Sequence, residues 1–167
     1  MMKKILLFAA FALFSAISFG QNSLAMDKNQ LNLGVGFSNL GVPFYIGLDH
    51  AVSRNVTLGA ELSYRSYRED WDYVYYDHSI TGISGNANYH FNNLFHIPRN
   101  WDLYAGLNLG FYSWNSPKTY GGSHISGLGL GAQVGGRYFL SKNVALNLEF
   151  GGGNAFSDGK FGLTVKL

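Results

Sequence analysis

The sequence predicts an all-β protein, an eight-stranded antiparallel up-and-down transmembrane β-barrel. Three observations lead to this fold class. Apolar residues return at every second position in eight successive segments, which is the period of a strand with two different faces. Charged residues make up only 13% of the chain, about half the usual share in soluble proteins. Glycine, with 22 residues, and the aromatic residues, at 16%, are over-represented.

The first twenty residues have the layout of a secretory signal peptide. Two lysines precede an apolar run from Ile5 to Phe19, which is shorter than a membrane-spanning helix, and a small residue follows at Gly20. We therefore expect residues 1–20 to be a signal peptide, cleaved after Gly20 or, as a second possible site, after Ala25. Residues 21–167 then form one outer-membrane β-barrel domain.

Composition excludes several kinds of site and partner. The chain has no cysteine, which excludes disulfides and a lipid-attachment cysteine. Removing the two signal lysines from the twelve basic residues leaves ten, against ten acidic ones, and a neutral chain has no charge that would attract nucleic acid. We expect no cofactor and no metal, because no phosphate-binding glycine loop and no ligand spacing among the five histidines is visible.

Each of the eight segments presents apolar side chains on one face. In chain order these positions run from Leu31 to Phe37, Phe44 to Leu48, Val56 to Tyr64, Ile83 to Phe91, Leu103 to Phe111, Leu128 to Tyr138, Val144 to Phe150 and Phe161 to Leu167. The opposite faces carry mainly glycine, serine and asparagine. A sheet facing water would need more lysine and glutamate, so we expect the apolar faces to meet lipid and the polar faces to fill the interior. No segment after the signal has helical spacing.

Connection lengths divide the predicted barrel into two ends. One end holds both termini and the connections containing Ser53-Arg54, Asn92–Asn100 and Ser141-Lys142. The other end holds the segments Asn39–Val42, Tyr67–His78, Ser113–Ser123 and Gly152–Asp158. Bacterial outer-membrane barrels keep their termini and short turns in the periplasm and their longer loops outside. We therefore expect a multi-pass protein of a Gram-negative outer membrane, with periplasmic N- and C-termini.

Aromatic residues sort by depth along these strands. Those expected near the outer ends are Phe37, Phe44, Tyr64, Phe111, Phe150 and Phe161, and those near the inner ends are Tyr89, Phe91, Trp101 and Tyr138. Amphipathic rings favour the two interfaces of a bilayer, so this distribution supports a barrel that spans lipid.

The run GLGAQVGGRYFLSKNVALNLEFGGG, within Gly127–Gly153, and the closing KFGLTVKL carry a resemblance to a known family. The chain resembles the small outer-membrane β-barrel family of OmpX-like and OmpA-like proteins, including the outer membrane protein β-barrel domains of Bacteroidetes. The shared pattern is a Gly-x-Arg-Tyr-Phe strand, a short turn and a strand with an inward Glu149. The resemblance implies contact with outer-membrane lipid and insertion by the outer-membrane assembly machinery, although the chain ends on Leu167 rather than on an aromatic residue.

The polar faces contain charged residues that we expect inside the barrel. Counting from the hairpins predicts three inward pairs: Glu149 opposite Lys160, Asp102 diagonal to Arg137, and Glu61 with Arg65 on the third segment. Such residues would line an ion path in an open barrel. Eight strands enclose an interior that side chains just fill, and buried charges need partners, so we expect structural ion pairs in a filled lumen.

The stretch YREDWDYVYYDH, Tyr67–His78, has five aromatic residues and four carboxylates around one arginine. It extends the third segment beyond the outer girdle, and we expect a hairpin with its turn near Glu69–Asp72. The residues expected at its surface are Trp71, Tyr73 and Tyr75, with Asp70 and Asp72 on the other side, and Trp114 and Tyr120 nearby. Such a tip would anchor a surface protein or a glycan through its rings, or would be a solubilising loop without a ligand.

Three functions follow from these features. The first is a non-enzymatic barrel that serves envelope structure or surface interaction through its extracellular loops. The second is an outer-membrane esterase, because His124 and Ser126 resemble the His-x-Ser pair of a lipid A deacylase. The expected orienting acid is missing, since the next glutamate is the inward Glu149. The third is a soluble lipocalin-like ligand carrier, which the nearly uncharged polar faces disfavour.

Overall fold

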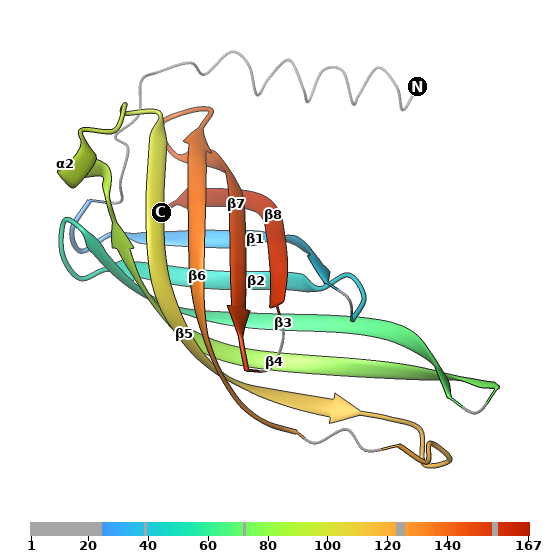
Figure 1. The fold of residues 1–167 in the computed structure, drawn as a ribbon. Helices are drawn as coiled ribbons and strands as arrows, with labels where there is room; N and C mark the ends of the chain where they lie inside the picture. Colours follow the sequence, from blue (N-terminus) through green and yellow to red (C-terminus); the bar gives the residue numbers. More distant parts are fainter. Residues whose placement is uncertain (1–24, 39, 72, 123–125, 155–156) are drawn as a thin grey trace, which may run out of the picture.

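Eight antiparallel strands, each paired with the next along the chain, close into a barrel where the last strand pairs with the first (Figure 1). This computed structural model describes residues 25–38, 40–71, 73–122, 126–154 and 157–167. The strands are β1 (Asn29–Ser38), β2 (Phe44–Ala51), β3 (Val56–Trp71), β4 (Val74–His90), β5 (Trp101–Asn115), β6 (Gly127–Phe139), β7 (Val144–Gly153) and β8 (Ser157–Lys166). The predicted fold class and strand number are confirmed.

The barrel wall is much taller on one side than on the other. β1, β2, β7 and β8 have 8 to 10 residues, close to the roughly 9–11 that a tilted strand needs to cross a bilayer. β3, β4 and β5 have 16, 17 and 15 residues, so they continue beyond their neighbours. Figure 1 shows the β3–β4 hairpin projecting from the end of the barrel opposite to α2.

One short helix departs from the expectation that no helix follows the signal. The helix, α2 (Asn92–Phe95), forms the connection between β4 and β5 and ends at His96, which has a φ of 52°. The buried Asn92 amide nitrogen donates to the carbonyl of Trp101 at 2.6 Å, and its oxygen accepts the Leu103 N–H at 3.1 Å. A single turn is too short to show helical spacing. Among the described residues, no helix is long and apolar enough to span a membrane.

The outer surface of the barrel is apolar, and the interior is polar. Outward side chains such as Leu107 and Leu128 are 63% and 71% exposed. Polar side chains are buried inside, among them Gln30, Asn32, Asp49, Thr57, Asn88, Gln133, Asn147 and Thr164. This arrangement is the reverse of a soluble lipocalin-like carrier, whose apolar side chains face inward, and it suits a bilayer. The third predicted function therefore does not fit the structure.

Three predictions about register and turns were wrong in detail. Asp102 lies directly opposite Arg137 rather than diagonal to it. The β3–β4 turn comes after Trp71 rather than near Glu69–Asp72, because Trp71 still pairs with Val74. The β7–β8 connection is shorter than the expected segment Gly152–Asp158, since Gly152 still pairs with Ser157 and Gly151 with Asp158. In each case cross-strand pairing continues past residues that favour turns.

Candidate functional site

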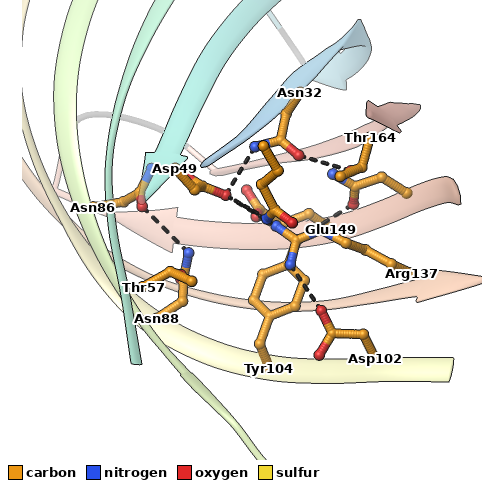
Figure 2. Close-up of polar contacts among 12 residues, drawn as sticks. Asn32, Asp49, Thr57, Asn86, Asn88, Asp102, Tyr104, Arg137, Glu149 and Thr164 are labelled. Atoms are coloured by element: carbon orange, nitrogen blue, oxygen red, sulfur yellow. Dashed lines mark hydrogen bonds and ion pairs between the residues drawn. The ribbon is translucent and has the colours of Figure 1, made fainter. Parts of the chain in front are cut away.

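In the half of the lumen nearer α2, side chains pack around the buried Arg137. The Arg137 side chain, on a residue that is 1% exposed, donates from Nη1 to Asp102 at 3.0 Å and from Nη2 to Asp49 at 3.2 Å (Figure 2). Its guanidinium carbon lies 4.2 Å from the centroid of the Tyr104 ring, and Asp102 also lies 2.7 Å from Nδ1 of His90. The register places Asp102 and Arg137 on adjacent strands, whereas Asp49 meets Arg137 across the lumen from β2.

Neutral polar side chains complete this layer. Gln30 and Asn32 on β1 both donate from their side-chain amides to Asp49, at 2.9 and 2.8 Å. The Thr164 hydroxyl donates to the Asn32 oxygen at 2.7 Å, which connects β8 to β1 inside the barrel (Figure 2). Each buried charge here is thus hydrogen-bonded, as burial away from water requires.

A second ionic layer lies nearer the hairpin end. The Lys160 ammonium donates to both carboxylate oxygens of Glu61, at 2.7 and 3.0 Å, and lies 3.2 Å from Glu149. Glu149 also accepts the Tyr104 hydroxyl at 2.9 Å. The structure thus brings Glu149 and Lys160 together on facing strands, as the sequence predicts. Glu61 thus meets Lys160 across the lumen, and the guanidinium of Arg65, on the same strand as Glu61, donates to the Ser38 hydroxyl at 3.1 Å.

Little space remains between these layers. A cavity of about 40 Å³ at the hairpin end and a deeper one of about 20 Å³ share the lining residues Tyr45, Glu61, Glu149 and Lys160. Volumes of this size hold a few water molecules, which each need about 10–15 Å³. The described lumen is therefore plugged by side chains and has no passage of porin width.

The inner face of the β3–β4 hairpin carries an aromatic array, which we call the tip cluster: Tyr67, Tyr76, His78, Trp114 and Tyr120. The His78 ring stacks on Tyr67, with centroids 5.2 Å apart, and meets the edge of Tyr120 at 4.6 Å. Tyr76 contacts Tyr120 at 5.2 Å, and Trp114 contacts Tyr67 at 6.2 Å. The cluster joins β3, β4, β5 and the β5–β6 loop, and its His78 ring is fully buried.

Hydrogen bonds hold the β5–β6 loop against the hairpin. Nδ1 of His78 lies 2.8 Å from the Ser116 hydroxyl. The Tyr120 hydroxyl donates to Glu69 at 3.2 Å, and the Tyr76 hydroxyl donates to the Thr119 carbonyl at 3.3 Å. These contacts give the protruding part of the molecule a fixed shape.

The pKa of Tyr67 provides a test of this packing. Burial, with a further contribution from the Glu69 carboxylate, raises the pKa of the Tyr67 hydroxyl from 10.0 to about 12. The raised pKa means that the folded cluster favours the neutral phenol, a preference fully present below pH 10 and lost as the pH rises through 12. In alkaline titrations of tyrosinate absorbance, the difference between the unmodified protein and Tyr67→Phe should appear near pH 12. A difference centred near pH 10 would contradict the packing.

The predicted surface residues do not form one face. Tyr73 lies in the turn with a φ of 61° and is 97% exposed, and Tyr75 is 70% exposed and pairs with Asp70. Even-numbered residues face outward on β3 and odd-numbered residues face outward on β4, because Trp71 pairs directly with Val74. Tyr75 and Asp70 therefore share the outward face, whereas Tyr67 and Tyr76 face inward. Asp72 and the side chain of Trp71 lie outside the described part of the chain. Sequence reasoning missed His78 and Tyr76, which the correct turn position would have placed opposite Tyr67 and Glu69.

Of the predicted esterase pair, the structure describes only Ser126. His124 lies outside the described residues. The Ser126 hydroxyl, just before β6, accepts the backbone N–H of Trp114 at 2.9 Å. Glu149 is engaged in the lumen by Lys160 and Tyr104. Within the described ranges, no three histidine or acidic side chains gather closely enough to hold a metal ion.

Neither a family model nor a curated protein matches the sequence. Solved structures match across nearly the whole barrel. OprG from Pseudomonas aeruginosa has a TM-score of 0.67 at 8% identity, with 89% of this chain and 99% of that chain covered. The N-terminal β-barrel domain of Pseudomonas aeruginosa OprF has a TM-score of 0.57 at 15% identity, with 84% of this chain and 96% of that chain covered. Neisserial surface protein A has a TM-score of 0.56 at 17% identity, with 84% of this chain and 94% of that chain covered. The chain has the fold of the small eight-stranded outer-membrane β-barrels.

Proposed function

We propose that this chain is a non-enzymatic integral outer-membrane barrel that presents the β3–β4 hairpin at the cell surface as an interaction element. The observation that supports the proposal most directly is the tip cluster. It fixes the hairpin and the β5–β6 loop in one shape, while Tyr73 and Tyr75 remain exposed. Exposed aromatic side chains on a rigid support are the groups that anchor protein and glycan partners.

The proposal includes an orientation. Both described chain ends, Ala25 and Leu167, lie at the α2 end of the barrel with the short turns, and the long hairpin lies at the other end. Outer-membrane barrels keep termini and short turns in the periplasm. We therefore assign the termini to the periplasm and the hairpin to the outside. We also propose that residues 1–20 direct secretion and that the outer-membrane assembly machinery inserts the barrel. The proposed family is the OmpX-like, Bacteroidetes type.

An esterase role fits the described geometry less well. Nucleophilic attack by Ser126 needs a base and an acid that orients the base. The Ser126 hydroxyl is already engaged by the Trp114 N–H, and Glu149 is held inside the lumen. We propose that overproduction of the protein leaves the acyl chains of lipid A unchanged. Loss of an acyl chain, seen by mass spectrometry and abolished by Ser126→Ala, would contradict the non-enzymatic assignment.

The surface-interaction proposal predicts a loss of binding from two substitutions. The barrel, reconstituted in phospholipid nanodiscs, is applied to arrays of glycans and of extracellular proteins. Replacing Tyr73 and Tyr75 with serine should weaken every specific signal at least tenfold, because exposed aromatic anchors dominate such interfaces. The matched control replaces Leu94 and Phe95 of α2, two exposed apolar residues at the opposite end, with serine. Equal binding by both variants would contradict the proposal.

Orientation is checked separately with single cysteines, which the cysteine-free chain allows without background. A membrane-impermeant maleimide should label Tyr73→Cys on intact cells, and should label Leu94→Cys only after the outer membrane is permeabilised. The reverse pattern would overturn the orientation and leave the fold unaffected.

A further inference from the structure

A short motif recurs four times at the end of the barrel that carries α2 (Figure 1). A lysine or arginine followed by an asparagine stands at the start of every strand that runs from this end toward the hairpin. The four copies are Lys28-Asn29 at β1, Arg54-Asn55 before β3, Arg99-Asn100 before β5 and Lys142-Asn143 before β7. The surface-interaction proposal does not involve these residues.

The asparagine of each copy makes the last backbone contact of the sheet, and the cation lies just beyond it. Each asparagine carbonyl accepts a backbone N–H from the end of a neighbouring strand, at 2.7 to 2.9 Å. The donors are His90, Phe139, Lys166 and Leu167. In the two tight turns, the hydroxyls of Ser53 and Ser141 also accept the asparagine N–H, at 3.3 and 3.4 Å. Similar backbone contacts therefore hold the four cations at equivalent positions on the rim.

The four cations form what we call the basic collar: Lys28, Arg54, Arg99 and Lys142. Neighbouring strands lie about 4.8 Å apart, so cations at alternate strands are spaced by roughly 10 Å around the circumference. All four residues are exposed, and in the part of the chain that the structure describes none of them has an ion pair. Asp27 is the only exposed acidic residue in the described part of this end. The collar therefore has an excess of positive charge.

The hairpin end has no matching excess. Among the described residues, its exposed cations are Arg68 and Lys118, and Arg68 donates to Asp77 at 2.8 Å. Asp70 and Asp77 are exposed there as well, and Glu69 is partly exposed. An anionic ligand that meets both ends of the barrel would therefore favour the α2 end.

The collar borders the lipid-facing surface. Trp101 follows Arg99 by two positions and lies opposite Tyr138 on β6, where the two exposed rings pack with centroids 4.9 Å apart. Tyr89 has a similar place on β4, opposite Val56 at the start of β3. Such rings favour the interfacial layer of a bilayer. Cations just beyond them lie at the level of the lipid headgroups, and their apolar stems suit that position.

We infer that the basic collar binds the phosphate groups of anionic phospholipids and selects these lipids over zwitterionic ones in the leaflet around the α2 end. Cations spaced around the whole rim suit a ring of surrounding headgroups, whereas a docked acidic protein would be met by cations gathered on one side. Each cation near an anionic surface adds to the attraction. The inference is independent of any partner of the hairpin. Only the assignment to the periplasmic leaflet rests on the proposed orientation.

The test uses the refolded barrel in detergent micelles and native mass spectrometry. The probes are phosphatidylglycerol and phosphatidylethanolamine with identical acyl chains, lipid-free glycerophosphoglycerol, and polyglutamate as an acidic polypeptide. Phosphatidylglycerol should bind at least about fivefold more tightly than phosphatidylethanolamine. Raising ammonium acetate from about 20 to about 500 mM should at least halve this preference, because salt screens exposed charges. Glycerophosphoglycerol should bind much more weakly, since it has no acyl chains to lie on the apolar wall.

Three double variants assign the preference to the collar. Arg54→Gln with Lys142→Gln removes two collar cations and should lower the preference for phosphatidylglycerol to about twofold or less. Arg54→Lys with Lys142→Arg keeps both charges in the same turns and should retain the full preference. The matched control, Arg68→Gln with Lys118→Gln, removes two exposed cations from the hairpin end and should also retain it. A heat-dependent gel shift like that of the unmodified protein shows that each variant still forms the closed barrel.

Four results would overturn the inference: equal binding of the two phospholipids, an unchanged preference in the collar variant, an equal loss in the hairpin-end control, or binding of polyglutamate or glycerophosphoglycerol as tight as that of phosphatidylglycerol. The last result would assign the collar to a soluble anion. A reversed cysteine-labelling pattern would overturn the assignment to the periplasmic leaflet and leave the lipid preference in place. Failure of the surface-interaction proposal and failure of this inference are therefore distinguishable.

Discussion

Replacing Arg137 with alanine is expected to lower the free energy of unfolding by about 3–5 kcal/mol. The substitution removes the cation that Asp49 and Asp102 share, at 3.2 and 3.0 Å, and leaves two carboxylates in a site that is almost fully buried. It also removes the guanidinium that packs on the Tyr104 ring. The measurement is urea unfolding of the barrel in lipid vesicles, followed by tryptophan fluorescence.

Two further variants separate charge from packing in this experiment. Adding Asp49→Asn and Asp102→Asn to Arg137→Ala should recover a large part of the loss, because neutral amides cost less to bury than unpaired carboxylates. Arg99→Ala removes an exposed arginine from the β4–β5 connection and should change stability by less than about 0.5 kcal/mol. If Arg137→Ala were as stable as Arg99→Ala, the lumen would be hydrated enough to solvate these charges, and the plug described above would be wrong.

Alternation in the sequence was enough to predict eight strands and the direction of their faces. A period of two depends only on local backbone geometry, and a bilayer reverses the usual rule for which face is apolar without changing the period. Contacts between neighbouring strands were also accessible, because counting back from a turn places Glu149 opposite Lys160. Small errors in a turn position shift such a count, which is why Tyr75 and Asp70 were assigned to opposite sides and lie on one face.

Contacts across the lumen could not be predicted in this way. Lys160 meets Glu61 although the two residues are 99 positions apart and sit on strands that are not paired. Arg137 reaches Asp49 across 88 positions. These partners depend on the tilt of the strands and on how the closed barrel brings opposite walls together, and neither follows from pairing alone. The tip cluster depends likewise on the path of the β5–β6 loop, which brings Tyr120 to His78.

Closure itself leads to the second large prediction, at the seam between β8 and β1. Gly34 and Gly162 lie directly opposite each other there. A Cβ added to Gly162 would overlap the Leu33 carbonyl oxygen, and would lie 2.6 Å from the Tyr45 hydroxyl oxygen and 2.9 Å from the Gly34 Cα. Backbone atoms of a paired strand cannot move aside without separating the two strands. Gly162→Val should therefore cost about 3 kcal/mol or more and should reduce the fraction of protein that migrates as a closed barrel on unboiled gels.

Gly85→Val is the matched control, because it places the same side chain in the middle of another strand but on the lipid-facing side. A Cβ at Gly85 would have as its nearest neighbour the Gly59 carbonyl oxygen at 3.7 Å, which is an ordinary contact. The control should fold to the same extent as the unmodified protein, or slightly better, since valine favours strands and adds apolar surface to the lipid face. Equal closure of the two variants would mean that the β1–β8 seam can widen to admit a side chain. In that case the polar contacts that cross it, such as Thr164 to Asn32, would have to be maintained by something other than close strand approach.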